Sequence, residues 1–262
     1  MRLIIVGPGR AGGSLALASA RAGHEIAAVL GDSDRHYGTA IQPGEEFPEA
    51  DVALVCVRDD QIEEVVEEIR DLVSSVTVVA HVSGFVPITV LNPLASTGVS
   101  VGGFHPLQTL PDPERGASSL AGSHVGIDGD LLAVDALTHL ALALEMSPFR
   151  LSDEVRPLYH AAAAAASNFV VTALATAADL FDAAAIDPKV SRPLVDRVVS
   201  NVFDSGARKS LTGPIARGDT ETVVGHLVAA HQVSHAVGRQ YRLLAEATAI
   251  IADQEDEVGK WR

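Results

Sequence analysis

The glycines near the start of the sequence have the spacing of a phosphate-binding turn. The stretch GPGRAG, residues 7–12, is a GxGxxG pattern that directly follows a short apolar run. In such a pattern the first glycine permits a tight turn, the second lets a pyrophosphate approach the backbone, and the third allows a helix to pack closely on the strand. The N-terminus of that helix favours an anion. We therefore expect a dinucleotide site with these candidate residues: Gly7, Gly9, Arg10, Ala11, Gly12 and, at the end of a later strand, Val57.

Residues after the second apolar run bear on which dinucleotide is bound. Asp32 would accept hydrogen bonds from a ribose 2′-hydroxyl and repel a 2′-phosphate, which favours NAD. Arg35 and Arg10 would instead hold a 2′-phosphate, with Ser33 as a further donor, which favours NADP. Either NAD or NADP is expected, and a solvated turn is the structural alternative for Asp32 and Arg35.

Polar side chains follow two later strands, in the stretches HVSG and FHPLQ. Ligands of parallel sheets bind outside the carboxyl ends of the strands, so Ser83 and His105 are expected at such a site. Because an imidazole titrates near neutral pH, His105 could protonate a carbonyl oxygen as a hydride reaches its carbon. Ser83 would orient His105 or the substrate. The structural alternative is a strand-end histidine bonded to backbone.

A third polar stretch, YHAAAAAASN, places His160, Ala164 and Asn168 four residues apart on one face of a predicted helix. The small residues between them would let a substrate approach, with His160 as a second candidate proton donor and Asn168 holding the substrate oxygen. Tight helix packing explains the same alanines equally well, with Asn168 bonded to a backbone carbonyl.

A carboxylate substrate needs a local cation in a chain of net charge −15. We expect Arg217 to supply it, with Thr212 adding a hydroxyl contact, although Arg217 could equally pair with Asp219. His231 and His235 share a helix face without the glutamate of a metalloprotease motif, so we expect no metal site.

The elements that position these residues alternate between strand and helix in the first half. Apolar runs at 3–7, 26–30, 51–57, 76–82, 99–104 and 124–127 predict strands. Amphipathic segments between them predict helices, which indicates an α/β fold with a doubly wound parallel sheet. From residue 152 onward only helical patterns follow, and the tail 253–262 is expected to be frayed. The domains are therefore predicted at 1–151 and 152–262, the second all-helical.

Composition excludes several classes of function. The 34 acidic and 19 basic residues disfavour nucleic acids and anionic membranes as partners. The single cysteine, Cys56, permits no intramolecular disulfide and fits a reducing, cytoplasmic setting. The first residues lack a signal-peptide pattern, and no apolar run reaches the roughly 20 residues of a membrane span.

The stretches GPGRAG, HVSG, FHPLQT, YHAAAAAASN and LTGPIARGD, in this order, resemble the Rossmann-like proteins with a C-terminal helical domain of unknown function, DUF2520. The resemblance covers nearly the whole chain. It implies kinship with pyrroline-5-carboxylate reductases, β-hydroxyacid dehydrogenases and coenzyme-F420-type NADP oxidoreductases. Some members are similar to an alternative class of ketopantoate reductase, which acts in pantothenate synthesis.

The related families imply where this chain departs from a common pattern. In β-hydroxyacid dehydrogenases a catalytic lysine lies four residues before an asparagine, and matching that asparagine to Asn168 puts Ala164 at the lysine position. The only lysines are Lys189, Lys209 and Lys260. Prephenate dehydrogenases are similar in carrying a catalytic histidine in a His-Pro motif beside a strand-end serine, which match His105 and Ser83.

These observations predict an NAD(P)-dependent oxidoreductase that reduces a small 2-oxo acid similar to ketopantoate. A homodimer through the helical domain is expected. Two alternatives stay open: a reductase of a cyclic imine, which arrives already protonated, and a catalytically silent protein that senses NAD(P)H.

Overall fold

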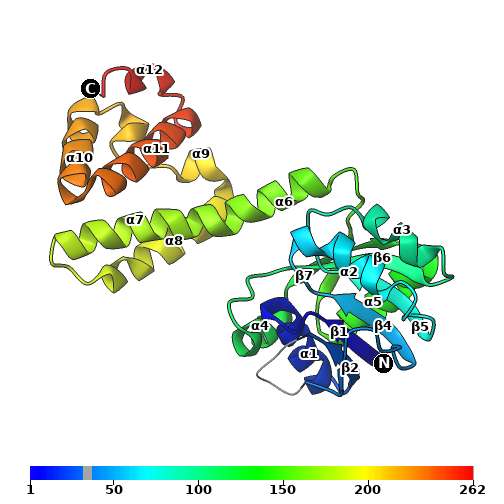
Figure 1. Cartoon of the computed structure of the whole chain (residues 1–262). Coiled ribbons are helices and arrows are strands. Elements are labelled where there is room, and N and C mark those ends of the chain that lie inside the picture. The colour runs from blue at the N-terminus through cyan, green and yellow to red at the C-terminus, as the bar shows by residue number, and fades with distance from the viewer. Residues whose placement is uncertain (32–36, 262) are drawn as a thin grey trace. The chain divides into compact units, whose positions relative to one another are not determined.

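The computed structural model describes residues 1–31 and 37–261 of the chain, coloured from blue to red in Figure 1. The chain divides into two compact units, Met1–Ala164 and Ala165–Arg262. The strands end at Arg150, close to the predicted domain boundary after residue 151, but the first compact unit continues through one further helix.

Eight strands form one sheet in the order β3-β2-β1-β4-β5-β6-β7-β8. Neighbouring strands are parallel apart from β6 and β7, so the predicted doubly wound α/β fold is confirmed with one antiparallel pair added. The strands are β1 (Arg2–Val6), β2 (Glu25–Leu30), β3 (Ala40–Ile41), β4 (Ala50–Val55), β5 (Val76–His81), β6 (Ser100–Leu107), β7 (His124–Gly129) and β8 (Ser147–Arg150).

The antiparallel pair arises because the chain turns back at the carboxyl end of β6. The connection contains one short helix, α4 (Pro113–Leu120), which packs against α1 (Arg10–Arg21). For β7 to run parallel to β6, the connection would have to carry the chain back to the amino ends of the strands. Instead β7 begins beside the end of β6, where His124 pairs with Leu107.

Alternate residues of the central strands fill two separate apolar cores. Leu3 and Ile5 of β1 face one core, which α1, α4 and α5 (Leu131–Ala143) complete. Ile4 and Val6 face the other, which is covered by α2 (Ile62–Ile69), η2 (Ile88–Leu91) and α3 (Asn92–Ala95). The short turn η1 (Asp59–Gln61) leads into α2. This period of two, with both faces apolar, is what a sheet covered on both sides requires.

The second unit is all-helical. Its elements are η3 (Ala165–Phe169), α7 (Val170–Ala183), η4 (Pro188–Ser191), α8 (Arg192–Ser205), α9 (Ala207–Ser210), η5 (Ile215–Arg217), α10 (Thr220–Val233), α11 (His235–Ile251) and α12 (Glu255–Val258). Val223, Leu227, Ala245 and Ala249 form its small core with Trp261. The expectation of a frayed tail is therefore wrong, because burial of the Trp261 indole holds the last residues against α10 and α11.

One long helix joins α6 (Arg156–Ala164), η3 and α7. Over Arg156–Ala183 it is long and apolar enough to cross a membrane by length and composition, although scattered polar residues interrupt its apolar stretches. Only 6% of its most apolar window is buried within the chain. The segment η3 is π-helical, and π-turns inside helices occur frequently at functional sites.

Candidate active site

The register of the sheet brings the predicted motifs to one edge. Val6 of β1 pairs with Val55 of β4, and Val55 in turn pairs with His81 of β5. His81 pairs with Gly103 of β6. The chain segments that follow these four residues therefore leave the same carboxyl edge, where ligands of doubly wound sheets bind.

The turn after β1 has the geometry that the GxGxxG pattern predicts. Gly7 has a φ of +89°, a conformation that residues with a Cβ rarely adopt. A Cβ on Gly12 would overlap the Gly7 carbonyl oxygen, so the third glycine permits the close packing of α1. Gly9 is the N-cap of α1 and no described side chain caps this helix. The first N–H groups of α1 are thus available to an anion.

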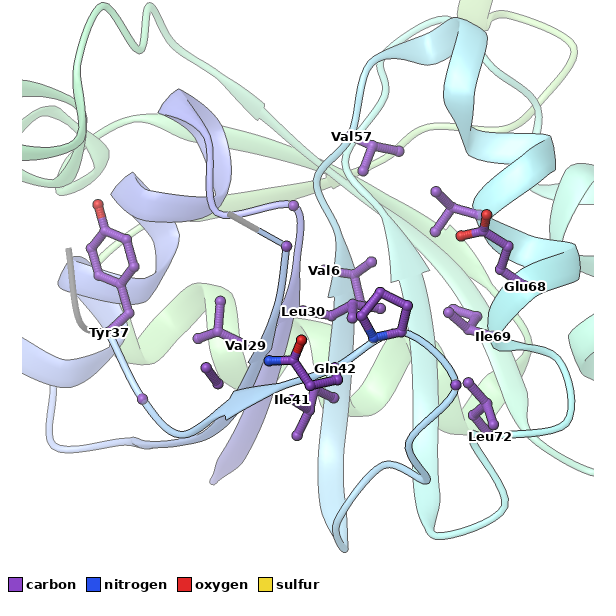
Figure 2. Close-up of a pocket in the computed structure, with 17 residues that line it drawn as sticks. Val6, Val29, Leu30, Tyr37, Ile41, Gln42, Val57, Glu68, Ile69 and Leu72 are labelled. Atoms are coloured by element: carbon purple, nitrogen blue, oxygen red, sulfur yellow. The ribbon is translucent and has the colours of Figure 1, made fainter. Parts of the chain in front are cut away.

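A cavity of about 680 Å³ lies over the ends of β1, β2 and β4. Figure 2 shows Val6 and Leu30 at its floor, with Ile69 and Leu72 of the α2 side facing Ile41 and Gln42. Its volume is within the usual range for small-molecule sites. Glu68 is its one charged residue among the described lining.

The structure describes three of the remaining candidate cofactor residues, of which only Val57 lines the cavity. Val57 lines the cavity and lies against the Gly7 turn. Arg10, which is exposed, and Ala11 begin α1. Asp32, Ser33 and Arg35 lie outside the described residues, so the choice between NAD and NADP stays open.

The second cluster of polar groups surrounds His105, which lies within β6 two residues beyond Gly103. Its Nδ1 is 2.7 Å from the hydroxyl oxygen of Tyr159, and the two rings meet edge to face with centroids 5.4 Å apart. The ring of His160 is 6.0 Å from that of His105 and 6.1 Å from that of Phe85. The structure thus brings His105 and His160 together.

Burial determines the charge of these groups. It lowers the pKa of His105 to about 4, with the positive charges of His160 and Arg156 as lesser causes. Burial also raises the pKa of the Tyr159 phenol to about 12. His105 is therefore neutral at pH 7, in contrast to the near-neutral pKa expected from the sequence.

Gly84 leaves room for the His105 ring. A Cβ at position 84 would lie 2.7 Å from His105 Nε2 and 2.8 Å from its Cε1. The backbone of Gly84 does not need a glycine for its φ, so the close approach of the ring is the reason for one. The Nε2 edge of His105 thus lies against the loop that follows β5.

Ser83 shapes this loop. Its Oγ accepts hydrogen bonds from the backbone N–H groups of Phe85 at 3.1 Å and Val86 at 2.9 Å. Its own N–H donates to Nδ1 of His81, whose pKa is lowered to about 3, chiefly by burial. In the described structure no hydrogen bond joins Ser83 to His105, so its geometry favours a role in holding the loop.

A buried ion pair ties the same loop to the start of α6. The guanidinium of Arg156 is fully buried, with Nε 2.8 Å from Asp153 Oδ1 and Nη1 3.0 Å from the Ser83 carbonyl oxygen. The Asp153 carboxylate also accepts the N–H of Ile88 at 2.8 Å. Arg156 Nη2 has no hydrogen-bond partner within the described ranges and lies against Gly103.

Asn168 lies in the second unit, within the π-helical segment η3. The wider π-turn changes the spacing between Ala164 and Asn168, and the alignment of Asn168 with His160 stays a prediction. The Asn168 side chain is exposed, with Oδ1 3.5 Å from Ser167 Oγ.

The other predicted residues of the second unit are also exposed. Thr212 lies in the loop after α9, and Arg217 ends the short 3₁₀ turn η5. His231 lies on α10 and His235 begins α11, so the expectation that they share one helix face is wrong, although their rings are 5.4 Å apart. The described residues contain no metal-binding cluster of His, Cys, Asp or Glu.

Sequence reasoning missed four residues of the His105 cluster: Tyr159, Gly84, Asp153 and Arg156. Tyr159 and Arg156 stand beside the predicted His160, in RPLYH, but nothing in the sequence states that this segment contacts HVSG and FHP. The one available signal was Arg156 at the start of an apolar helix, because a buried arginine needs a charged or hydrogen-bonding partner.

The chain matches two domain families. Residues 1–106 match the Rossmann-like domain, and residues 123–248 match a domain of unknown function, DUF2520. No protein of curated function matches the sequence.

Several solved structures share the fold along nearly the whole chain. A candidate NADP oxidoreductase from Bacteroides fragilis has a TM-score of 0.81 at 23% identity, covering 95% of this chain and 97% of that one. An imine reductase from Streptomyces aurantiacus has a TM-score of 0.64 at 16% identity, covering 99% of both chains. A Plasmodium falciparum pyrroline carboxylate reductase with NADP bound has a TM-score of 0.63 at 13% identity, covering 96% of this chain and 98% of that one. The chain is therefore a Rossmann-like protein that carries a DUF2520 domain.

Proposed function

We propose that this protein is an NAD(P)H-dependent reductase of a small carbonyl or imine compound. The observation that carries the proposal is the shared sheet edge: the Gly7 turn after β1, the loop after β5 and His105 in the last part of β6 lie toward the same carboxyl end. An anion-binding helix end and a hydrogen-bonding imidazole on one edge are what a dinucleotide and its substrate require.

The residues fit the cofactor. The uncapped N-terminus of α1 would hold the pyrophosphate, and the 680 Å³ cavity beside it would take the adenosine half. Gly9 has nothing within 4 Å of a Cβ position, so its outer side is open to a ligand. The P. falciparum structure has NADP bound, and the B. fragilis protein is described as a candidate NADP oxidoreductase, which supports the same cofactor class here. When bound, NAD(P)H supplies a hydride at nicotinamide C4.

The His105 cluster would serve the other half of the reaction. As the substrate carbon accepts the hydride, the π electrons of its double bond to oxygen move onto that oxygen, which then takes one proton. His105, neutral at pH 7, would donate a hydrogen bond to the oxygen as charge develops there. His160, half-buried beside it, would pass the proton from solvent. The products are the alcohol and the oxidised cofactor.

A 2-oxo acid similar to ketopantoate is our first substrate class. The resemblance of the sequence motifs to alternative ketopantoate reductases supports it. Arg217 would bind the carboxylate and Thr212 would add a hydroxyl, while Asn168 would hold the oxygen. Arg217 is exposed, and its positive charge acts on the nearby Asp219 carboxylate. An anionic substrate would therefore share the guanidinium with Asp219.

A cyclic imine is the second class. The low pKa of His105 favours it, because a neutral imidazole is a weak acid and a protonated imine needs none. Fold similarity to an imine reductase and to a pyrroline carboxylate reductase is consistent with this alternative.

A second copy of the chain is the proposed macromolecular partner. Helix α8 buries none of its residues within the described chain, yet it exposes Leu194, Val198 and Val202 along one stripe and Phe203 beside it. A 14-residue helix without packing is marginal in water. Because one apolar face can pack on the same face of a second copy, a two-fold dimer would bury it. Cytoplasmic location is proposed alongside, because the single cysteine, Cys56, is a buried free thiol.

Steady-state oxidation of NADPH and NADH, in parallel, tests the proposed function. Purified protein is given ketopantoate, a series of other 2-oxo acids and a series of cyclic imines. Turnover of a 2-oxo acid supports the first class, and turnover of imines alone supports the second. Tight binding of the cofactor without turnover of any compound contradicts the reductase and favours the sensor.

A further inference from the structure

The contact between His105 and Tyr159 joins two distant segments in a fixed geometry. Tyr159 lies on α6 and His105 on β6, and their polar atoms are 2.7 Å apart. The tyrosine ring is also held by Phe149 of β8, with centroids 5.7 Å apart and the planes tilted by 56°. Two aromatic neighbours therefore determine where the phenol hydroxyl lies.

Buried polar contacts fix the start of α6 in place. Arg156, one turn before Tyr159, bonds both Asp153 and the Ser83 carbonyl oxygen from a fully buried position. Ser83 in turn precedes Gly84, on which the His105 ring rests. The ion pair thus connects the helix that carries the phenol to the loop that contacts the imidazole.

The protons of this pair can be assigned from its hydrogen bonds. Burial keeps the Tyr159 phenol protonated and the His105 imidazole neutral, so each ring carries one exchangeable hydrogen. Within the described structure, His105 Nδ1 is the one hydrogen-bond partner of the Tyr159 hydroxyl. If the phenol donates to Nδ1, the imidazole hydrogen must reside on Nε2.

We propose that Tyr159 is a positioning residue that donates to Nδ1 of His105 and thereby fixes the imidazole in the tautomer with its hydrogen on Nε2. The Nε2–H then lies at the edge beside Gly84, available to a substrate oxygen or nitrogen. The opposite tautomer would present a lone pair there, which repels the electron pair that builds up on a carbonyl oxygen. The role of Tyr159 in turnover rests on the proposed reductase function. The tautomer of His105 does not depend on that function.

The first test is therefore made on the full-length protein without cofactor or substrate. Protein labelled with ¹⁵N in its histidines gives nitrogen signals that distinguish Nδ1–H from Nε2–H, and a His105→Asn variant assigns those of His105. We expect the Nε2–H form in the wild type and a mixture of both forms in Tyr159→Phe. An Nδ1–H form in the wild type, or no change in Tyr159→Phe, overturns the proposal.

A matched control exists in the second unit. The Tyr241 hydroxyl lies 3.0 Å from Nδ1 of His226, in the same edge-to-face arrangement. Tyr241→Phe should alter the His226 signals and leave those of His105 unchanged. Because the wild-type tautomer is itself decisive, the proposal stays testable even if Tyr159→Phe folds poorly.

Kinetics then separate positioning from simple packing. With whichever compound is reduced, Tyr159→Phe should lower kcat at least tenfold and leave the KM for NADPH within twofold. An equal kcat would contradict a role in turnover while leaving the tautomer result intact. Absence of turnover in the wild type would contradict the reductase but not the tautomer.

Discussion

At the scale of single residues, the chemistry of His105 is determined by what surrounds it. Burial and neighbouring positive charge keep the imidazole neutral, and Tyr159 occupies its Nδ1. A buried, neutral histidine acts best as a hydrogen-bond donor aimed at developing charge. We propose His160, half-buried beside it, as the route for the proton itself.

Replacement of His105 should affect turnover and not cofactor binding. His105→Asn removes the donor at the substrate oxygen, so we expect kcat/KM to fall by roughly 10²–10³-fold. The Kd for NADPH, measured by fluorescence titration, should stay the same because the Gly7 turn is unaltered. The matched control is His139→Asn, an exposed histidine on α5. An unchanged rate in His105→Asn would remove this residue from the mechanism.

The low pKa values of the buried histidines predict acid sensitivity. His105 and His81 titrate at about 4 and about 3 in the folded protein, below the 6.5 of a free histidine. Below pH 6.5 the unfolded chain therefore binds more protons, and the free energy of unfolding must fall as the pH drops toward 4. Above pH 6.5 this contribution is fully present.

Urea unfolding at a series of pH values measures that dependence. The positive charge of Arg156 faces both histidines, and Asp153 partly opposes its effect on His81. His105→Asn should flatten the slope of unfolding free energy between pH 6.5 and 4, whereas His139→Asn should not. Equal slopes in both variants would mean that His105 is not buried as neutral imidazole.

At the scale of elements, two helix beginnings organise the site. Helix α1 starts at a turn that leaves its N–H groups without a side-chain cap, as an anion site requires. Helix α6 starts at a buried arginine that fixes it to the loop after β5. The start of α1 is suited to binding an anion, whereas the start of α6 is fixed in place by its ion pair.

Gly9→Ala separates a ligand role from a folding role. The added Cβ meets nothing within 4 Å and the φ of Gly9 is −70°, so the unfolding free energy should change little. The same methyl group would occupy the approach of a pyrophosphate, and we expect the Kd for NADPH to rise at least about tenfold, ~1.4 kcal/mol. Gly225→Ala on α10, also in open space, should leave the Kd unchanged. Equal affinities in Gly9→Ala and wild type would place the cofactor elsewhere.

Removal of the Arg156 charge should destabilise the first unit. Arg156→Met leaves the Asp153 carboxylate partly buried without its cation, a change that costs about 3–5 kcal/mol in comparable buried pairs. Urea unfolding followed by circular dichroism measures it. Arg192→Met, which breaks an exposed pair with Asp196, should have no measurable effect. A loss no greater than in Arg192→Met would show that the pair does not hold α6.

At the scale of the whole molecule, the second unit exposes more large apolar side chains than its small core buries. Its described core contains five buried apolar residues, while α7 and α8 expose many more. A solvent-exposed apolar patch of this kind marks an interface. We propose a second copy of the chain as the partner that covers this patch, because a homodimer requires no other protein.

Light scattering after gel filtration tests the dimer. Phe203, 87% exposed on α8, should be covered in the dimer, so Phe203→Glu is expected to give monomers. The control is Leu131→Glu, at a leucine 93% exposed on α5 of the first unit, which should remain dimeric. A monomeric wild type contradicts the dimer, and recovery of the wild type in the membrane fraction would point to the long apolar helix instead.

Much of the fold was predictable because it depends on local patterns. The apolar runs and the glycine spacing at residues 7–12 determine the strand–turn–helix start, and both are visible within a few residues of sequence. The antiparallel direction of β7 was not predictable, since nothing in residues 108–123 indicates at which end of β6 the next strand begins. Trp261 likewise packs against residues far away in sequence.

The site was predictable only in part for the same reason. His105 and His160 stand out by residue type, and the structure does bring their rings together. Tyr159 and Arg156 matter through contacts between segments that lie more than 50 residues apart, and Gly84 matters through its contact with the ring of His105 on another strand. Such contacts leave no local pattern. The low pKa of His105 also follows from packing and not from residue type.

The most direct test of the reductase is the fate of the hydride. NADPH and NADH deuterated at nicotinamide C4, on either face, are incubated with the protein and either ketopantoate or a cyclic imine, and the product is examined by mass spectrometry. We predict one deuterium on the former carbonyl or imine carbon, and its loss in His105→Asn under the same conditions. Bound cofactor with no deuterium in any product would contradict hydride transfer by this protein.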